Sequence, residues 1–496
     1  MSAAVLPEAR DLPSTTDHRT TSHGPPFRTP QPLPRQALRP QPLPVPRPTP
    51  VWWRDATAAA GWALVLFVVA LWVAGGGVTD FTSVGESLTN AGRLAGLVSS
   101  VLILIQVLLM ARIPMLEQAW GQDELARVHR LVGFTSFNLM LTHIALTIVG
   151  YSIGSNLGVV GTFVDEVLHS PGMLLALAGA VALVMVVVTS VRKARRRLRY
   201  ESWHLLHLYA YLGAGLALPH QLWTGADFKR STVATVFWWG LYAAALLSVL
   251  AYRVVLPLVR SRRHRLVVAQ VRTESPTVTT VVVTGRDLHR LPVRAGQFFQ
   301  WRFLDGEGSS RANPYSLSAA PDGRSLRLTA AVVGDASARL ATLRPGTTVL
   351  VEGPYGRLHT GLRTRDRSVL IGAGIGITPL RALLEELPAG PDATVVIYRV
   401  GRQSDIVLAD ELLDLAQAKG ARVVAVVGHR RTDAESWLPA QSAHLGEAEA
   451  LQRIVPDIAQ RDVYVCGNPA WMDTVIAAAR EAGVPAGSIH HERFSY

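Results

Sequence analysis

The sequence contains one cysteine, Cys466, among 496 residues. A single cysteine excludes an intramolecular disulfide and any zinc or iron–sulfur site built on several thiolates. Charged residues are also scarce, at 17% against about 25% in an average soluble domain. No N-terminal signal peptide with a charged segment, an apolar segment and a cleavage site is recognisable.

The net charge of +12 is not accompanied by a nucleic-acid-binding motif or by a face that combines aromatic and basic residues. We therefore expect no nucleic-acid partner. The basic residues cluster beside apolar runs, which is typical of a membrane surface, so the expected partner is the lipid bilayer. The sequence identifies no protein partner.

Residues 1–52 form a proline-rich segment that holds many of the 30 prolines, in runs such as PPFRTPQPLPRQALRPQPLPVPRPTP. A segment of this composition cannot bury enough apolar surface to order itself. We predict a disordered cytoplasmic tail with local polyproline II conformation. A docking site for a proline-binding domain is the alternative.

Six apolar segments follow and predict a six-helix transmembrane domain over residues 53–260. Most are close to the ~20 residues that cross a bilayer, although the fifth is short and interrupted by polar residues. The segments are residues 56–76, 93–111, 128–150, 172–191, 203–219 and 233–256. Basic sequences such as RKARRRLR (192–199) and RSRRHR (260–265) occupy alternate loops. The positive-inside rule then predicts a multi-pass protein of the cell (plasma) membrane with both termini in the cytoplasm.

After Arg265 the long apolar runs give way to short alternating ones. RLVVAQVRTESPTVTTVVVTG is rich in valine and threonine and predicts strands joined by turns. From Ser368, SVLIGAGIGITPLRALLEEL and ATVVIYRV predict a strand, a glycine loop, a helix and a second strand, which is typical of an α/β unit. We therefore predict a small β domain over residues 261–362 and a nucleotide-binding α/β domain over residues 363–496.

Two of the predicted membrane segments carry histidines, which are costly inside a bilayer and indicate function. His129 and His143 are fourteen residues apart, so an ideal helix places them within ~40° of one face, ~21 Å apart. The fifth segment supplies His204, His207 and His220. The third and fifth segments run in the same direction, so an inner and an outer histidine pair can each hold a haem iron.

The spacing in the fifth segment leaves the choice of inner ligand open. His207 and His220 are thirteen residues apart, which is ~140° out of register on an ideal helix. Spacing therefore does not exclude His204 as the inner ligand. Histidines that only satisfy hydrogen bonds within a helix bundle are the alternative to a haem site.

The thirteen residues between the first two histidines and the twelve between His207 and His220 resemble the pattern of the ferric reductase and NADPH oxidase superfamily. YESWHLLHL resembles that family's sequence around the inner-haem ligand, with Glu201 six residues before His207. The resemblance implies two b-type haems, the inner one held by His129 and His207 and the outer one by His143 and His220. It also implies an antiparallel β-barrel FAD domain and a Rossmann-like α/β NAD(P) domain.

RANPYSLSAAP (311–321) resembles the flavin-binding strand of the ferredoxin–NADP reductase family. The resemblance implies that Tyr315 packs on the isoalloxazine and that Ser316 contacts the ring system. Arg311 and Asn313 are alternative contacts of the flavin diphosphate. The flavin-binding residues expected from this strand are Asn313, Pro314, Tyr315, Ser316 and Leu317.

A second candidate flavin segment is VVGDASARLATLRPGTTVLVEGPYG (332–356). Glycine followed by small residues lets backbone N–H groups approach a phosphate closely. The segment resembles the family's second flavin-phosphate loop, which assigns flavin contacts to Gly334, Asp335, Ala336 and Ser337.

GAGIGITP (372–379) lies between a predicted strand and a predicted helix, and its glycine spacing differs from the dehydrogenase G-x-G-x-x-G. After the flavin motifs, it resembles the pyridine-nucleotide loop of flavin reductases. The resemblance implies nucleotide contacts from Gly372, Gly374 and Gly376, with Thr378 and Pro379 facing the nicotinamide.

VYVCGNPAWMDTV (463–475) resembles the family's later C-G-P segment, which places Cys466 near the hydride path and Gly467 beside the nucleotide. A buried small residue is the alternative for Cys466. Arg399 follows the second strand and could hold a 2′-phosphate, which favours NADPH over NADH. The chain ends HHERFSY, where Phe494, or alternatively Tyr496, matches the family's aromatic that stacks on the flavin.

These motifs predict an NAD(P)H-dependent flavohaem oxidoreductase with FAD, two haems b and NADPH or NADH. Electrons would pass from cytoplasmic NAD(P)H through FAD and the haems to an extracytoplasmic acceptor. Arg93 matches an arginine beside the outer haem of the oxidases, but Thr147 stands where they carry a further histidine. A ferric chelate, dioxygen and quinone are therefore alternative acceptors. A membrane-anchored flavin reductase without transmembrane electron transfer is the alternative function.

Overall fold

The structure is a computed structural model that describes residues 52–79, 81–191, 200–306, 311–431 and 435–493. The chain divides into two compact units at the boundary between Leu258 and Val259, and each unit is described by itself. The predicted proline-rich tail lies outside the described residues, apart from Trp52.

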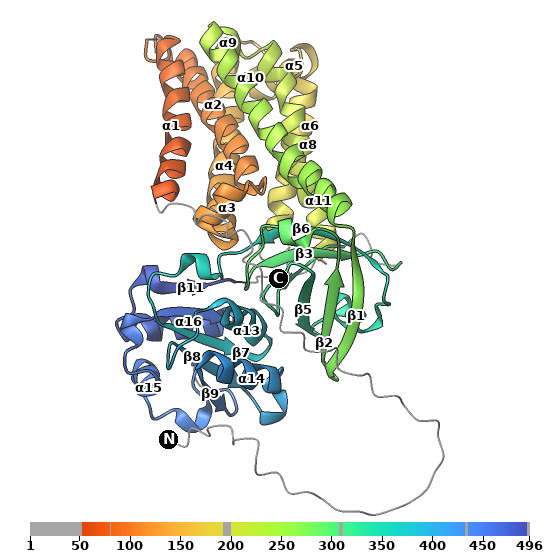
Figure 1. Ribbon diagram of the computed structural model, residues 1–496. Coiled ribbons are helices and arrows are strands. Elements are labelled where there is room, and N and C mark those ends of the chain that lie inside the picture. The colour runs from red at the N-terminus through yellow and green to blue at the C-terminus, as the bar shows by residue number, and fades with distance from the viewer. Residues whose placement is uncertain (1–51, 80, 192–199, 307–310, 432–434, 494–496) are drawn as a thin grey trace, which may run out of the picture. The chain divides into compact units, whose positions relative to one another are not determined.

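The unit before the boundary is helical, because a segment in a bilayer must satisfy its backbone hydrogen bonds internally. Its long helices, seen side by side in Figure 1, are α1 (Trp52–Ala74), α2 (Val84–Met110), α4 (Gln122–Ile153), α6 (Met173–Ser190), α8 (Tyr200–Trp223) and α10 (Thr232–Val249). Short helices lie in the connections: α3 (Pro114–Trp120), α5 (Gly158–His169) and α9 (Ala226–Lys229). The π-helical turn η1 (Leu250–Val255) joins α10 to α11 (Leu256–His264).

Five of the described helices are long and apolar enough to cross a membrane. They are α1, α2, α4, α6 and the continuous helix Thr232–His264. The chain is therefore a multi-pass membrane protein. The 24-residue α8 carries three histidines and is not among the five, so the sixth predicted span remains a prediction.

Close backbone contacts join these helices in pairs, α2 with α4 and α6 with α8. Ser99 in α2 donates from Oγ to the Ser136 carbonyl of α4 at 2.7 Å. A Cβ added at Gly179 in α6 would lie 2.7 Å from the Gly213 carbonyl oxygen of α8. Glycine is required here because any side chain would push the two backbones apart.

The second unit begins with an antiparallel sheet built from the predicted alternating segments. Its strands are β1 (Leu266–Ser275), β2 (Val278–Thr284), β3 (Phe298–Phe303), β4 (Asn313–Ser316), β5 (Ser325–Ala331) and β6 (Thr348–Tyr355). They pair in the order β4-β3-β6-β1-β2-β5. The edge strands meet only through the isolated bridge between Leu317 and Leu328, so no continuous ladder among the described residues closes the predicted barrel.

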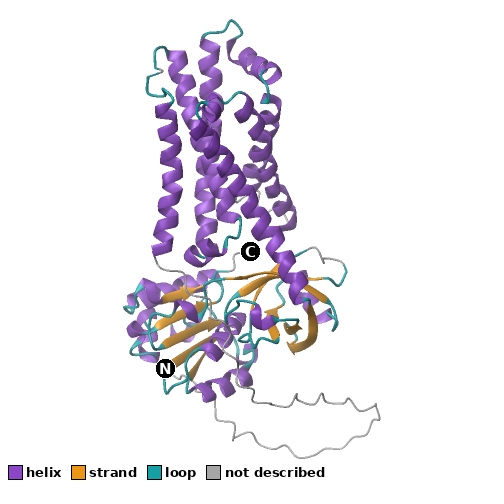
Figure 2. Ribbon diagram, turned by 45° about the horizontal axis from the view of Figure 1, so that its top comes forward, coloured by secondary structure: helices purple, strands orange, loops and turns teal. Residues whose placement is uncertain are grey.

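A parallel sheet follows, with strands β7 (Ser368–Ala373), β8 (Thr394–Val400), β9 (Arg422–Val427), β10 (Asp462–Cys466) and β11 (Ile489–His491). Helices α13 (Ile377–Glu386) and α14 (Ala409–Lys419) cover one face, and α15 (Glu447–Ile454) and α16 (Pro469–Glu481) cover the other. Figure 2 shows this sheet in orange among purple helices. Successive strand residues point to opposite faces. Val369 and Ile371 accordingly pack in one core, and Leu370 packs in the other.

The order of this sheet, β11-β10-β7-β8-β9, reverses between β7 and β10. In open parallel sheets, ligands bind at the carboxyl ends of the strands where the order reverses. The Gly372–Gly376 loop follows β7, and Gly467 follows β10. The fold therefore brings two predicted nucleotide segments together, although almost a hundred residues separate them.

Candidate functional site

Both histidines of α4 bond to backbone carbonyls of α2. His129 Nδ1 lies 3.3 Å from the Gln106 oxygen, and His143 Nδ1 lies 2.9 Å from the Gly92 oxygen. A carbonyl only accepts hydrogen bonds, so Nδ1 carries the proton in both rings and Nε2 keeps a free lone pair. Metal-ligating histidines are commonly oriented by a bond from the other ring nitrogen to a carbonyl.

Two histidines of α8 approach the two histidines of α4, which gives one pair at each of two positions along the helices. The His207 and His129 ring centroids are 6.0 Å apart, and His207 Nδ1 lies 3.3 Å from Ser190 Oγ in α6. At the other end of α8, His220 is close enough to His143 for an electrostatic interaction. His220 Nδ1 is buried and has no hydrogen-bond partner among the described residues.

The surroundings of the second pair leave little room for other side chains. A Cβ added at Gly96 in α2 would lie 2.7 Å from His143 Nδ1. Gln221, next to His220, donates from Nε2 to Ser100 Oγ at 3.1 Å and accepts from the Tyr242 hydroxyl at 2.6 Å. These bonds tie the end of α8 that carries His220 to α2 and α10.

These residues suit a haem better than a bare metal ion. Within the described ranges, no group of three histidine, cysteine, aspartate or glutamate side chains could hold a metal ion. Paired imidazoles with free nitrogens suit an iron whose other ligands come from a macrocycle. A haem fits the adjacent rings of His129 and His207. It also fits the His220 ring, whose Nδ1 has no hydrogen-bond partner among the described residues.

Arg93 in α2 is held by an acidic partner. Its guanidinium binds both carboxylate oxygens of Asp227 in α9, with Nε–Oδ2 at 3.0 Å and Nη2–Oδ1 at 2.7 Å. It follows Gly92, whose carbonyl accepts from His143. Thr147 is buried and donates to the His143 carbonyl at 2.6 Å. The Glu201 side chain lies outside the part of the chain that the structure describes.

The predicted flavin strand is β4, which pairs antiparallel with β3. Tyr315 lies opposite Phe299, and its carbonyl accepts from Trp301 Nε1 at 2.9 Å. Ser316 lies opposite Phe298 at the end of the ladder, and the next residue, Leu317, is fully buried. The sheet core thus holds the backbone of this strand, while the Asn313–Ser316 side chains stay half-buried.

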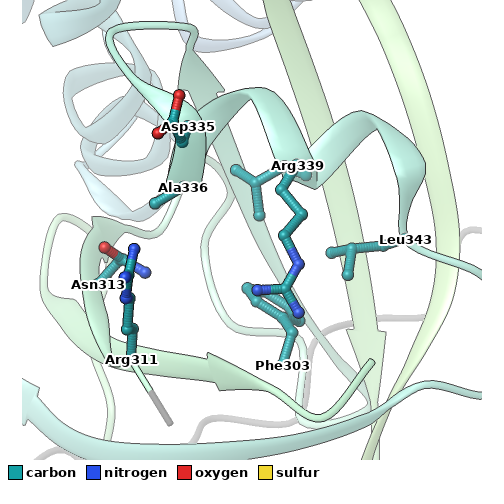
Figure 3. A pocket seen from close by; sticks show the side chains of 8 residues that line it. Phe303, Arg311, Asn313, Asp335, Ala336, Arg339 and Leu343 are labelled. Atoms are coloured by element: carbon teal, nitrogen blue, oxygen red, sulfur yellow. The ribbon is translucent and has the colours of Figure 1, made fainter. Parts of the chain in front are cut away.

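A cavity of about 230 Å³ brings the two predicted flavin segments together (Figure 3). It is lined by Phe303, Arg311, Asn313, Asp335, Ala336, Arg339, Leu340 and Leu343. Figure 3 shows Arg311 and Asn313 on one side of the cavity and Arg339 on the other. Guanidinium groups favour phosphate oxygens, and that of Arg339 is bound by the Asp305 carboxylate, with Nε–Oδ2 at 3.0 Å.

The Ser337 side chain makes hydrogen bonds to the backbone of the second candidate flavin segment. Its hydroxyl accepts from the backbone N–H groups of Val333 at 2.9 Å and Gly334 at 3.1 Å, and donates to the Gly334 carbonyl at 2.8 Å. The side chain is buried. Ser337 therefore closes the loop that begins the short helix α12 (Asp335–Ala338), while Asp335 and Ala336 reach the cavity.

The sequence reasoning missed four residues of this cavity. Arg339 lies four residues after Asp335, and a helical turn from Asp335 would have placed both on one side. Phe303 comes from β3 and is brought to the cavity by strand pairing alone. Leu340 and Leu343 complete its apolar wall.

The nucleotide loop is packed against the end of β10. Gly372 lies opposite Cys466 in the ladder, and Gly374 has a φ of +53°, which favours glycine. A Cβ at Gly376 would lie 2.3 Å from the Cys466 carbonyl oxygen, and one at Gly467 would lie 2.7 Å from the Trp471 ring. A side chain at Gly376 would separate the loop from β10, and one at Gly467 would displace the Trp471 ring.

Thr378 and Pro379 are buried at the start of α13, and Thr378 Oγ1 donates to the Ile375 carbonyl at 2.9 Å. Cys466 is 4% exposed, and burial, with the charge of Glu492, raises the pKa of its thiol to about 12. Cys466 is therefore a neutral thiol at physiological pH. Phe494 and Tyr496, the two candidate flavin-stacking aromatics, lie outside the described residues.

Arg399 is buried within the fold. Its Nε donates to the Trp437 carbonyl at 3.1 Å, and its Nη atoms donate to the carbonyls of Val400, Val426 and His429. Burial and the nearby charge of Arg430 lower the pKa of Arg399. Backbone carbonyls therefore engage the guanidinium that the sequence assigned to a 2′-phosphate, and this geometry does not favour NADPH over NADH.

Two family models match the chain. The ferric reductase like transmembrane component matches residues 95–218, and the oxidoreductase NAD-binding domain matches residues 370–477. The first match includes both histidines of α4 and His207. The second includes the glycine loop and the Cys466 segment.

Curated relatives match about half of the chain. The ferredoxin reductase component of 3-ketosteroid-9-alpha-monooxygenase from Rhodococcus rhodochrous is 28% identical over 47% of this chain and 66% of its own length. Ferredoxin–NADP reductase B from Sorangium cellulosum is 28% identical over 45% of this chain and 94% of its own. The flavohemoprotein of Bacillus subtilis is 25% identical over 46% of this chain and 58% of its own.

Among solved structures, the FAD/NAD-binding domain of nitric oxide dioxygenase from Vibrio cholerae is 27% identical. The match covers 47% of this chain and 99% of that one, with a TM-score of 0.37.

The second unit is similar to ferredoxin reductases and contains the match to the oxidoreductase NAD-binding domain, which supports a flavin- and NAD(P)H-dependent reductase module. In this chain the module is fused to a ferric reductase-like transmembrane component. This fusion confirms the predicted resemblance to the ferric reductase and NADPH oxidase superfamily.

Proposed function

We propose that this protein moves electrons from cytoplasmic NAD(P)H, through FAD and two b-type haems, to an extracytoplasmic acceptor. The observation that carries the proposal is the pairing of histidines at two levels of α4 and α8. His129 with His207 and His143 with His220 would hold the haems. A flavin reductase that used its helices only as an anchor would have no need for these pairs.

The bound cofactors supply the redox chemistry, with two-electron steps at the flavin and one-electron steps at the haem irons. The chain orients them. Hydrogen bonds to Gln106 and Gly92 carbonyls hold His129 and His143 in the tautomer that presents Nε2. The two levels are about 20 Å apart along each helix, because each residue adds ~1.5 Å. The pairs would therefore carry charge between two depths of the membrane.

The second compact unit, which begins at Val259 and is called the reductase unit below, would bind FAD and the nicotinamide nucleotide at separate places. Arg311, Asn313 and Arg339 surround the cavity that fits the flavin diphosphate. Gly372, Gly376 and Cys466 lie where the parallel sheet reverses its order, which suits the nicotinamide nucleotide. The domains in this proposal are an FAD-binding β domain over residues 261–362 and a Rossmann-like NAD(P) domain over residues 363–496.

The topology belongs to the same proposal. With α8 as the sixth span, both termini are cytoplasmic and the arginine-rich loops face the same side. The protein would then reside in the plasma membrane, with the outer histidine pair, His143 and His220, nearest the acceptor.

The acceptor we propose is a ferric chelate, or dioxygen, which would give superoxide. Arg93 is bound by Asp227, and Thr147 replaces the additional histidine of the oxidases. A ferric chelate needs only electron access to the outer haem edge, whereas reduction of dioxygen at a dedicated site would need binding residues beside that haem. Superoxide and ferric-chelate reduction assays would distinguish the two.

The test is a reduced-minus-oxidised visible spectrum of the purified full-length protein after addition of NADPH, beside the His143→Ala variant. We expect a low-spin b-type spectrum and loss of about half the haem in the variant. Absence of haem from the wild-type protein would leave a membrane-anchored flavin reductase and overturn the proposal of transmembrane transfer.

A further inference from the structure

One carboxylate links the antiparallel sheet to the nucleotide-binding domain. Glu411 in α14 accepts from Arg327 Nη1 of β5 at 3.1 and 2.9 Å. Arg381 in α13 places Nε 3.1 Å from the same carboxylate. Glu411 therefore bridges a guanidinium of the sheet and a guanidinium of the helix that directly follows the glycine loop.

Both arginines also hold the chain that leaves the flavin strand. The Ser318 carbonyl accepts from Arg327 Nη2 at 2.7 Å and from Arg381 Nη1 at 3.1 Å. Ser318 lies two residues after Ser316, the end of β4, and is fully buried. Next to it, the Ala320 N–H donates to the Glu385 carboxylate of α13.

Hydroxyl groups extend this cluster into the sheet. Thr329 Oγ1 donates to Ser318 Oγ at 2.8 Å and lies 2.8 Å from Thr280 Oγ1. Arg327 Nε donates to Ser318 Oγ at 3.2 Å. The flavin strand and the helix behind the nucleotide loop are thus connected through one continuous set of hydrogen bonds and ion pairs.

The charges in this cluster depend on one another. The Arg327 and Arg381 side chains are 12% and 9% exposed, and that of Glu411 is 33% exposed. Burial raises the pKa of Glu411, but the Arg327 and Arg381 charges outweigh it, so that the net shift is downward. Removing one partner from a buried ion pair is strongly unfavourable, because the remaining charge lacks compensation. Without Glu411, Arg327 would lose the carboxylate to which it is bonded, whereas Arg381 would keep its ion pair with Glu385 at 2.8 Å.

We infer that Glu411 is a positioning residue, which fixes the nucleotide-binding domain against the flavin strand in the geometry that hydride transfer requires. The inference rests on the proposed function of the reductase unit. Transfer of the hydride oxidises the nicotinamide and reduces the flavin, and its rate depends on sub-ångström placement of the two reactants. Glu411 acts through Arg327 and Arg381.

The experiment compares full-length Glu411→Gln with Asp414→Asn. Asp414 is an exposed carboxylate one turn further along α14 and controls for loss of charge on that helix. Flavin reduction by NADPH is followed by stopped flow per bound FAD, and NADP⁺ affinity by titration. Hydrogen–deuterium exchange is measured over residues 313–331 and 377–386.

For Glu411→Gln we expect flavin reduction to be at least tenfold slower per bound FAD, with NADP⁺ affinity within about threefold of wild type. Exchange should rise in both segments. Asp414→Asn should match wild type in all three measurements. Adding Arg327→Gln to Glu411→Gln should slow the reaction by less than the product of the single effects, since both act on one contact.

An unchanged rate per bound FAD, or unchanged exchange in both segments, would overturn the inference. A parallel loss of FAD and of thermal stability with a normal rate per flavin would indicate a merely structural role and would also overturn it. Failure of wild-type protein to oxidise either NADPH or NADH would instead refute the proposed function, while the exchange comparison would still test the domain contact.

Discussion

The imidazole of His129 in α4 lies beside that of His207 in α8, with ring centroids 6.0 Å apart. His204 is three residues earlier in the same helix, almost one turn away. The contact favours His207 as the partner of His129, which the spacing of the histidines had left open.

This pairing predicts different haem contents for two neighbouring substitutions. His207→Ala should reduce the haem content of purified protein by about half, because one of two axial pairs is broken. His204→Ala, the matched control on the same helix, should keep the wild-type content. The measurement is the pyridine haemochrome absorbance per protein. Loss of haem in His204→Ala with retention in His207→Ala would reverse the assignment.

Arg311 should be required for flavin affinity. Its guanidinium lines the cavity that fits the FAD diphosphate, and a hydrogen bond to a charged group contributes about 1.5–3 kcal/mol. Arg311→Ala should therefore weaken FAD binding by about 10- to 100-fold, measured by fluorescence titration of deflavinated protein. Arg324→Ala, an exposed arginine in the same domain, serves as the control. Equal FAD affinity in the two variants would show that the FAD diphosphate does not bind in this cavity.

Arg399→Met should affect stability rather than nucleotide choice. The guanidinium donates to backbone carbonyls, and leaving buried acceptors unpaired costs about 1–3 kcal/mol. We expect a lower melting temperature and a ratio of kcat/KM for NADPH to that for NADH within threefold of wild type. A selective loss of NADPH activity of tenfold or more would indicate that Arg399 does bind the 2′-phosphate of NADPH.

His359 should make the reductase unit sensitive to acid. Burial and the charges of Arg294, Arg357 and His490 lower the pKa of His359 to about 3, against 6.5 for an ordinary histidine. The unfolded chain then binds a proton between pH 6.5 and about 3 that the folded chain does not. Stability is therefore lost as the pH falls through this window, by up to about 1.4 kcal/mol per pH unit.

The check is urea-induced release of FAD from full-length protein between pH 7.5 and 5. His359→Gln should flatten the pH dependence of the free energy of unfolding below pH 6.5 by the contribution of one proton. His289→Gln, at an exposed histidine, should leave the slope as in wild type. Identical slopes in wild type and His359→Gln would mean that His359 titrates in the folded protein as it does in the unfolded chain.

Much of the architecture could be predicted from the sequence because it depends on local patterns. Long apolar runs predicted helices α1, α2, α4 and α6, since composition and length decide whether a segment can cross a bilayer. Alternating valine and threonine predicted the strands near Arg265, and the strand–glycine–helix order around Gly372 predicted the α/β domain. These patterns involve neighbours in the chain, so the sequence alone determined them.

The partners of individual side chains were decided only by the tertiary structure. A ring contact placed His207 beside His129, and the carbonyls of Trp437, Val426 and His429 enclosed Arg399. Glu411 reached Arg327 across 84 residues of sequence. Such contacts depend on strand order and helix packing, which a local pattern does not encode, and they determine which residues bind a ligand and which hold the fold together.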